Sequence, residues 1–394
     1  MIRIKTSTPF WALLLAGGIL LASCSQDAIF YTIQYDKVLN KNAAVPGSPG
    51  KIISLGSDPD NALYTGSNAI YRYKNPGSGA ASWIRLPAQP GGKRIMDLAG
   101  TEAGPDSYLY ALVMQGVNLS ESGLYRKPNP NNDANAGPWE SVDKAGGGAI
   151  QSLIGAGDTL FAGVYGGSLW YVTGRGGTLA QASGISGILK AAAFYAGRYY
   201  VALEGTGILS ADSPADLGAG DPLSHGGNTP GNFVGLVEAG NSLIAVSGGG
   251  LIWRIDNSGA VVESKQFNVS CNGAVAKWKD PGSGNDTDLL LLGRAVAGGS
   301  SVTTYYYGYS ELPVTVTAGG TTPVLGAVLQ EPGLPMENAF TSVSNNNSYY
   351  NTLGTHAVIS LYQAPWDNVL FAATQQDGLW SCRSRGDPKE WNVE

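Results

Sequence analysis

One order of apolar segments recurs along most of this chain, and it limits the possible folds more than any other feature. An apolar segment leads to a Leu- or Tyr-aromatic-Ala segment, then to a Gly-rich turn and a Gly-apolar-aromatic segment, and in some copies to a short segment centred on Trp. The copies begin mostly about 35–50 residues apart, which is the length of one small antiparallel sheet. They occupy residues 52–86, 95–142, 150–171, 189–209, 234–254, 274–309 and 357–393.

Each copy has the pattern of a strand meander that cannot bury both of its faces alone. Stacking such sheets around an axis buries Leu and aromatic side chains between neighbours. The 56 Gly residues and the charged fraction of only 14% suit many short strands joined by tight turns. The sequence therefore predicts an all-β fold, a seven-bladed β-propeller of four-stranded antiparallel blades over residues 51–394. A pair of β-sandwiches is the alternative. Residues 189–203 could also form a helix, but the repeat favours two strands with a turn at Ala196-Gly197.

The first residues have the three parts of a secretory signal. Arg3 and Lys5 supply the positive start, residues 10–22 are apolar, and the run ends in Leu21-Ala22-Ser23-Cys24. The apolar run is shorter than the ~20 residues of a membrane-spanning helix. Its last four residues resemble the lipobox of bacterial lipoproteins, which implies a signal peptide over residues 1–23 and lipidation of the Cys24 thiol. The alternative is an uncleaved membrane anchor with a chance cysteine.

The predicted cleavage also sets the charge of the exported part. Loss of residues 1–23 removes Arg3 and Lys5 and no acidic residue, so the net charge of −6 becomes −8. With this charge and no Lys/Arg cluster, we expect no nucleic-acid partner, and acyl chains must hold the protein at the membrane. Ser25 resembles the outer-membrane address of enterobacterial lipoproteins, where Asp marks inner-membrane retention. We therefore expect a lipid-anchored protein of the cell envelope, at the outer membrane rather than the inner.

Two stretches fall outside the repeat. Residues 24–50 predict a lipidated linker, in which the apolar residues 28–38 could add a strand that closes the ring. Residues 311–349 are rich in Thr, Gly, Pro and Asn and predict an insertion on the sixth unit. Tyrosines among small polar residues favour recognition surfaces. The candidate partner-binding residues are therefore Tyr305, Tyr307, Tyr309, Tyr349 and Tyr350. The alternative is an insertion that has no partner.

The last copy of the repeat carries a family resemblance. Its segments Leu370-Phe371-Ala372-Ala373, Gly378-Leu379-Trp380-Ser381 and Glu390-Trp391 resemble propellers with sialidase-type Asp-box repeats, including the photosystem II assembly-factor-like propellers. The full box is Ser-x-Asp-x-Gly-x-x-Trp. Residues 75–79 before Trp83 keep the Gly and the Trp but lack the Asp. The resemblance implies the propeller fold and says little about activity.

Catalytic residues are not evident in the sequence. A sialidase-type site needs three arginines to clamp a carboxylate. The candidates are Arg72, Arg126, Arg254 and Arg383, which follow the aromatic residue of the third segment in four of the units. This shared placement indicates a role in the repeat or at a solvated blade edge. No nucleophile elbow, phosphate-binding loop or dinucleotide fingerprint occurs. We therefore expect a module that holds an envelope protein or glycan, without catalysis or a cofactor. A glycosidase- or lactonase-type enzyme is the alternative.

Metal binding and disulfide formation have equally weak signals. Asp286 and Asp288 could suggest a calcium loop, but no third carboxylate lies at ligand spacing. Cys271 and Cys382 have no metal-ligand spacing and fall on different units. We expect no bound metal and two unpaired thiols. A disulfide between them is the alternative, because an oxidising compartment would allow it.

Overall fold

The computed structural model divides the chain into a unit of residues 1–43 and a unit of residues 44–394. The structure describes only part of the second unit, namely residues 45, 47–56, 61–74, 82–92, 94–103, 106–131, 137–144, 148–227, 230–267, 271–279, 288–293, 309–316, 323–325, 358–364, 366, 369–375, 378–382 and 391–393. The predicted signal peptide, Cys24 and the possible strand at 28–38 therefore lie outside the described residues. In the described part, no helix is long and apolar enough to cross a membrane.

The described elements are almost all strands, with two short 3₁₀ helices. They are β1 (Ile52–Leu55), β2 (Ala62–Gly66), β3 (Ile70–Lys74), β4 (Trp83–Arg85), β5 (Arg94–Ala103), β6 (Asp106–Met114), η1 (Leu119–Glu121), β7 (Ser122–Pro128), β8 (Glu140–Ser141), β9 (Ile150–Ala156), β10 (Thr159–Val164), β11 (Ser168–Thr173), β12 (Ala180–Gln181), β13 (Ile188–Tyr195), β14 (Arg198–Glu204), β15 (Gly207–Ala211), η2 (Pro214–Ala219), β16 (Phe233–Ala239), β17 (Ser242–Ser247), β18 (Leu251–Ile255), β19 (Val261–Gln266), β20 (Val275–Lys279), β21 (Asp288–Gly293), β22 (Tyr309–Val316), β23 (Pro323–Leu325), β24 (Val358–Gln363), β25 (Leu370–Thr374), β26 (Leu379–Cys382) and β27 (Trp391–Val393).

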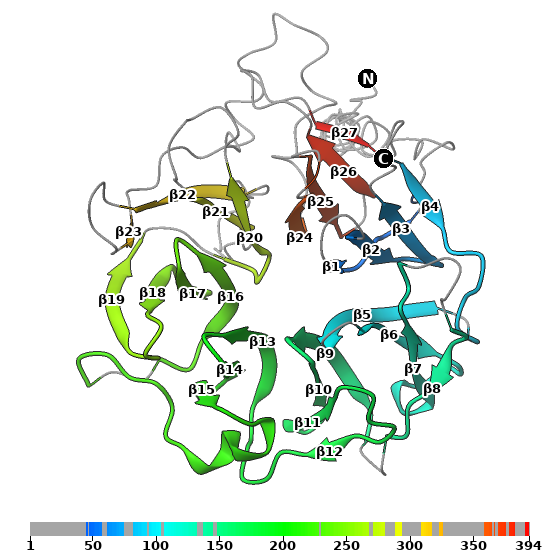
Figure 1. Cartoon of the computed structure of the whole chain (residues 1–394), viewed down its shortest axis with the longest axis horizontal. Coiled ribbons are helices and arrows are strands. Elements are labelled where there is room, and N and C mark those ends of the chain that lie inside the picture. Colours follow the sequence, from blue (N-terminus) through cyan, green and yellow to red (C-terminus); the bar gives the residue numbers. More distant parts are fainter. Residues whose placement is uncertain are drawn as a thin grey trace, which may run out of the picture. The chain divides into compact units, whose positions relative to one another are not determined.

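These strands form antiparallel sheets in sequence order, and the sheets are arranged as the blades of a β-propeller (Figure 1). The first strand of each sheet is innermost. These inner strands contact one another in the order β1, β5, β9, β13, β16, β20 and β24, and β24 contacts β1 again. The all-β propeller that the repeat predicts is confirmed.

The prediction that every blade has four strands is wrong. Six sheets have four strands, whereas the sheet β13-β14-β15 has three. After β15 the chain turns into η2, whose first turn is capped by Ser213, and Leu217 of η2 is buried against the neighbouring strands. The Leu223 N–H then donates to the Ile208 carbonyl at 2.8 Å, where a fourth strand would pair. A capped helical turn thus replaces the outer strand of this blade.

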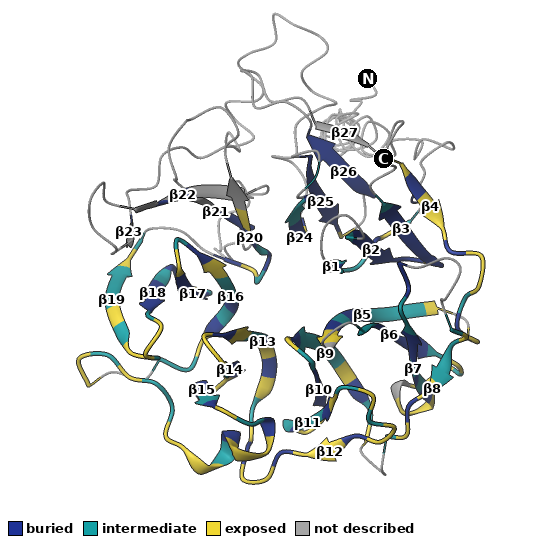
Figure 2. Ribbon diagram, viewed as in Figure 1, coloured by how far each residue is buried: buried dark blue, intermediate teal, exposed yellow. Residues whose placement is uncertain are grey.

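Where the Leu-aromatic-Ala motif of the repeat occurs, in β6, β10 and β25, it forms the second strand of a blade. This strand lies between two neighbouring sheets. In β10 every residue is buried. Phe161 packs against Leu189 and Val201 of the following blade, while Ala162 packs against Tyr110 of the preceding one. Successive side chains point to opposite faces of a strand, so an aromatic residue next to Ala fills one interface and leaves room in the other. Figure 2 shows the buried second strands between more exposed inner and outer strands.

Side-chain packing closes the ring between the first and last blades. Phe371 of β25 lies edge-on to the rings of Tyr73 and Trp83 from the first blade, with centroids 4.8 and 5.3 Å away. The Ile52 N–H donates to the Ser360 hydroxyl at 2.9 Å. Among the described residues, the first blade consists only of strands β1 to β4 and the last blade only of strands β24 to β27. No strand from one end of the chain completes the blade at the other end in this described part.

The predicted insertion at 311–349 is wrong in its first part. The sixth copy of the repeat was expected to end at residue 309, but the third strand of the sixth blade is β22, and residues 323–325 form its fourth strand β23. Leu312 and Val314 are buried within this sheet. The alternation of apolar residues at 312 and 314 is therefore a strand pattern, which the surrounding Thr and Gly residues obscure.

Candidate functional site

The propeller has two faces that differ in their connections. In an antiparallel meander, the turns between second and third strands lie at the same end as the segments that link one blade to the next. Hydrogen bonds between these turns and linking segments confirm this here: Gly187 N donates to Gly167 O at 2.9 Å, and Gly205 N donates to Gly231 O at 2.7 Å. We call this side of the propeller the linker face. The turns between first and second strands and between third and fourth strands form the opposite face.

Most turns on the linker face are tight, but the sixth blade differs. The second-to-third turn of the third blade spans only residues 165–167, between β10 and β11. In the sixth blade the equivalent connection covers residues 294–308, and the segment that links this blade to the last one covers residues 326–357. The described ends of both connections lie on the linker face. The described ends of the two longest connections of the sixth blade therefore share one face of the propeller.

The tyrosines that the sequence singles out fall in or beside these connections. Tyr305 and Tyr307 lie in the first connection and Tyr349 and Tyr350 in the second, outside the described residues. Tyr309 is instead the first residue of β22 and pairs with Gly293. The strand topology brings the ends of the two tyrosine-bearing connections to one face, although β22 and β23 separate these connections along the chain.

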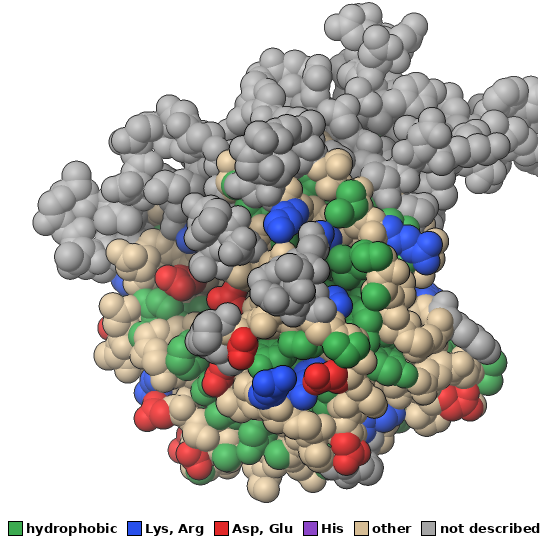
Figure 3. All heavy atoms as spheres, turned by 45° about the vertical axis from the view of Figure 1, so that its right-hand side comes forward, with side chains coloured by type: hydrophobic (Ala, Val, Ile, Leu, Met, Phe, Trp, Pro, Cys, Tyr) green, Lys and Arg blue, Asp and Glu red, His purple; other side chains and the backbone are tan. Residues whose placement is uncertain are grey.

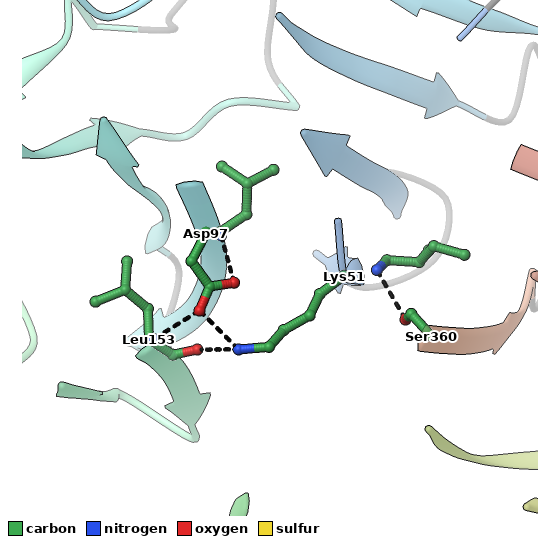
Figure 4. A network of polar contacts seen from close by, with 6 residues as sticks. Lys51, Asp97, Leu153 and Ser360 are labelled. Carbon is green, nitrogen blue, oxygen red and sulfur yellow. Dashed lines mark hydrogen bonds and ion pairs between the residues drawn. The ribbon is translucent and has the colours of Figure 1, made fainter. Parts of the chain in front are cut away.

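A polar network that was not predicted from the sequence joins the inner strands of several blades (Figure 4). The Asp97 carboxylate accepts hydrogen bonds from the Lys51 ammonium and from the Leu153 N–H, both at 2.8 Å. Lys51 also donates to the Leu153 carbonyl at 2.8 Å. The Asp97 side chain is only 10% exposed, whereas that of Lys51 is 40% exposed. The network therefore connects the first three blades close to the axis.

A recurring β-bulge positions Asp97. In β5 the register shifts between Ile95 and Asp97, so one extra residue bulges out of the strand. The inner strands β9, β13, β16 and β24 have a bulge at the corresponding place. A bulge bends the strand and redirects the following side chain. Asp97 and Ser360 both follow the bulge, and both accept a hydrogen bond from the inner strand of the next blade. In the sequence, the only indication of this contact is the carboxylate of Asp97 within an otherwise apolar strand segment.

The arginines considered for a carboxylate clamp are used within the framework. Arg72 of the first blade donates to the Pro130 carbonyl of the second at 3.1 Å. Arg126 of the second blade donates to the Gly176 carbonyl of the third at 2.6 Å and pairs with Glu140 at 2.8 Å. All three described arginines of the set, including Arg254, are buried. The predicted role in the repeat is confirmed for Arg72 and Arg126, and the solvated-edge alternative is wrong for the described members. Arg383 lies outside the described residues.

The thiols and potential metal ligands show no assembled centre within the described ranges. Cys271 and Cys382 are both buried, and no disulfide joins them, so the alternative of a disulfide between the two is wrong. Burial raises the pKa of the Cys271 thiol to about 11, so this thiol is protonated and unreactive at neutral pH. Among the residues that the structure describes, no group of three or more His, Cys, Asp or Glu side chains could hold a metal ion. Asp286 lies outside these residues.

Comparisons with known proteins support the fold. Models of known protein families give no match, and neither do curated protein sequences. Among solved structures, the chain is similar to PorZ, a bacterial surface component of the type-IX secretion system of Porphyromonas gingivalis, with a TM-score of 0.50 and 11% identity over 90% of this chain and 39% of that one. It is also similar to the extracellular domain of BT4673 from B. thetaiotaomicron, with a TM-score of 0.46 and 16% identity over 86% of this chain and 38% of that one.

A third similar structure is the WD40 β-propeller domain of Doa1, with a TM-score of 0.48 and 11% identity over 89% of this chain and 94% of that one. The identities are low, so these likenesses bear on the fold alone. The sheet topology and the closed ring of inner strands define the class of this protein, which is a β-propeller. Two of the similar structures are a surface component and an extracellular domain.

Proposed function

We propose that this protein is an envelope lipoprotein whose propeller is a non-catalytic module that binds another envelope protein or a glycan through its linker face. The observation that carries the proposal is the placement of the connections 294–308 and 326–357. Both begin and end on the same face of a frame whose other turns are mostly short. A rigid frame with variable connections on one side is the arrangement that binding proteins use.

The membrane anchor in this proposal rests on the N-terminal sequence. Arg3 and Lys5, the apolar run 10–22 and the lipobox-like Leu21-Ala22-Ser23-Cys24 are the features on which lipoprotein processing depends. The acidic exported part would not adhere to anionic lipid by itself, so acyl chains on Cys24 would hold it at the envelope. Ser25 supports the outer membrane over the inner. That PorZ is a surface component agrees with this location.

We propose that the propeller is not catalytic because the charged side chains that could have formed an active site already have structural partners. Arg72 and Arg126 bind carbonyl oxygens of neighbouring blades. Arg254 pairs with Glu263 at 3.1 Å. The Asp97 carboxylate is occupied by Lys51 and a backbone N–H. Groups held in this way cannot converge on a substrate without loss of the contacts between or within blades.

An affinity-capture experiment tests the binding role. Full-length protein in mild detergent would be compared with two variants, in which residues 294–308 or 326–357 are replaced by Gly-Ser sequences of equal length. Replacement of residues 280–287 is the matched control, because the ends of that connection, Lys279 and Asp288, lie on the opposite face of the same blade. We expect an envelope partner to be retained by the native protein and the control and lost from at least one linker-face variant. Equal retention by all four proteins would contradict the proposal.

A further inference from the structure

A neutral area of the linker face spans the third and fourth blades. It consists of three short segments, namely residues 148–149, 165–167 and 186–188. Backbone hydrogen bonds join these segments. The Tyr165 N–H donates to the Ala149 carbonyl at 2.8 Å, and the Gly167 N–H donates to the Gly187 carbonyl at 2.9 Å. The three segments therefore form one continuous surface, which we call the Tyr165 patch.

Two large apolar side chains of the Tyr165 patch are open to solvent. Tyr165 is 72% exposed, and Ile188 is 47% exposed. Glycine keeps the surface between them low, since a Cβ atom at Gly166 would meet no atom within 4 Å beyond its own chain neighbours. Burying the tyrosine ring and the isoleucine side chain against a partner would remove apolar area from water, which favours binding.

The distribution of charge over these two blades matches the anatomy of a protein interface. The Tyr165 patch contains no charged residue. At its border the Lys190 ammonium pairs with the Glu204 carboxylate at 2.8 Å, so these two charges satisfy each other. On the opposite face of the same blades, Asp158, Arg175 and Arg198 lie in or next to the turns. A centre without charge and with an exposed tyrosine, inside a polar rim, is typical of the buried part of protein–protein interfaces.

The wider surface gives no reason to expect a charged partner. On the face shown in Figure 3, Lys and Arg side chains and Asp and Glu side chains lie in small groups, some of them side by side, among apolar and uncharged groups. A broad area of one sign would attract a partner of the opposite sign, and this face has none. The apolar side chains of the Tyr165 patch are therefore the groups that would select a partner.

The polar groups of the Tyr165 patch are poorly suited to a glycan. A sugar site needs several polar side chains that fix the positions of the hydroxyl groups. The patch has only two polar side chains, Ser186 and Tyr165. Its backbone groups are partly used in the pairing of the segments, and the Ser186 carbonyl accepts a hydrogen bond from the Thr206 hydroxyl at 2.5 Å. Apolar contact is what the patch can offer.

We infer that the Tyr165 patch binds an uncharged apolar segment of the envelope partner, so that this partner is a protein and not a glycan. The inference rests on the proposed binding role of the linker face. It goes further because it assigns a contact surface on the third and fourth blades, built from described residues, in addition to the connections of the sixth blade.

Binding would be tested with two sets of short synthetic peptides and the full-length protein in mild detergent. One set contains uncharged apolar sequences, and in the matched set Asp or Lys replaces some of the apolar residues. We expect uncharged peptides to bind and charged ones to bind more weakly. Calorimetric titration of the tightest peptide should show a negative heat-capacity change, the sign of apolar burial, and an affinity that does not fall as salt is raised.

Substitutions at exposed positions locate the contact. Tyr165→Ser and Ile188→Ser should each weaken binding of that peptide about tenfold or more. Ile84→Ser and Phe194→Ser are the matched controls, because Ile84 on an outer strand is 46% exposed and Phe194 near the opposite face is 43% exposed. The controls should bind as the native protein does, and all four variants should keep the native melting temperature, since no buried contact is lost.

Several results would overturn the inference. They are no binding of any uncharged peptide at millimolar concentration, tighter binding of the charged set, or equal effects of Ile84→Ser and Ile188→Ser. Binding of a neutral sugar that Tyr165→Ser abolishes would assign the patch to a glycan, and self-association that Ile188→Ser abolishes would assign it to a second copy of the chain. Either result would overturn the inference as well.

This inference and the proposed function can fail separately. If the envelope partner depends on residues 294–308 or 326–357 but no uncharged peptide binds, the linker face keeps its proposed role and the inference about the Tyr165 patch is wrong. If Ile188→Ser abolishes peptide binding while replacement of both connections leaves capture of the partner intact, the patch is confirmed and the role of the connections is wrong.

Discussion

Replacing Asp97 with Ala should destabilise the propeller more than any conservative change at that position. The Asp97 carboxylate is the acceptor that joins the second blade to both of its neighbours, through Lys51 of the first and the Leu153 N–H of the third. Its other oxygen accepts a hydrogen bond from the Leu98 N–H at 2.9 Å. Alanine leaves these donors without their acceptor.

The expected size of the loss follows from the burial of each partner. Leu153 is fully buried, and a buried N–H left without an acceptor costs about 1–3 kcal/mol. The Lys51 side chain is 40% exposed, so solvent screens its attraction to the carboxylate, which contributes about 1 kcal/mol or less. The free energy of unfolding should therefore fall by about 1–4 kcal/mol. For a unit of this size that corresponds to a melting temperature lower by roughly 1–6 °C.

Thermal unfolding followed by circular dichroism would measure this change for Asp97→Ala and Asp97→Asn. Asparagine keeps one oxygen, which can accept from the buried Leu153 N–H, and loses the charge and the second acceptor that faces the Leu98 N–H. Its cost should therefore stay below that of alanine, at about 1.5 kcal/mol or less. A cost of less than about 0.5 kcal/mol for alanine, or equal costs for the two variants, would refute the reasoning, because the buried acceptor would then not be the important part of the network.

Three further predictions concern the anchor, the charges and the thiols. Cys24→Ala should abolish fatty-acid labelling and leave an unprocessed precursor, and continued labelling would contradict the lipobox assignment. Burial acts to raise the pKa of Glu263, but hydrogen bonds from Lys265 and Arg254 outweigh it and leave this pKa below its ordinary value of 4.5. The charged carboxylate therefore stabilises the fold above about pH 4.5 and loses this effect as the pH falls through the lowered pKa. Glu263→Gln should cost about 1–2 kcal/mol at pH 7 and less below pH 4 in acid-unfolding titrations. Cys271, with its pKa near 11, should react with iodoacetamide at pH 8 only after unfolding, and rapid labelling of the native protein would argue against its burial.

The fold could be predicted from the sequence because each blade repeats the same packing problem. The alternation of Phe161 and Ala162 reflects a strand that lies between two sheets, and the same alternation recurs from blade to blade. The turn at Ala196-Gly197 was also predicted correctly, since both residues have positive φ, at 49° and 81°. Tight hairpins favour such a turn because its twist matches that of the strands.

The departures from the repeat could not be predicted in the same way. η2 replaces a strand because Ser213 caps a helical turn and Leu217 finds a buried position, and both depend on neighbours that only the folded ring supplies. Asp97 becomes a contact between blades because a bulge redirects it, and a bulge leaves no clear periodicity.

The capture experiment with full-length protein tests the central claim most directly. An envelope partner held through the linker face should be recovered with the native chain and with the variant replaced at 280–287, and lost when residues 326–357 or 294–308 are replaced, while all four proteins show the same strand-rich circular dichroism spectrum. Recovery of the same partner by every variant, or its loss from the 280–287 variant alone, would contradict the proposal that the linker face is the binding surface.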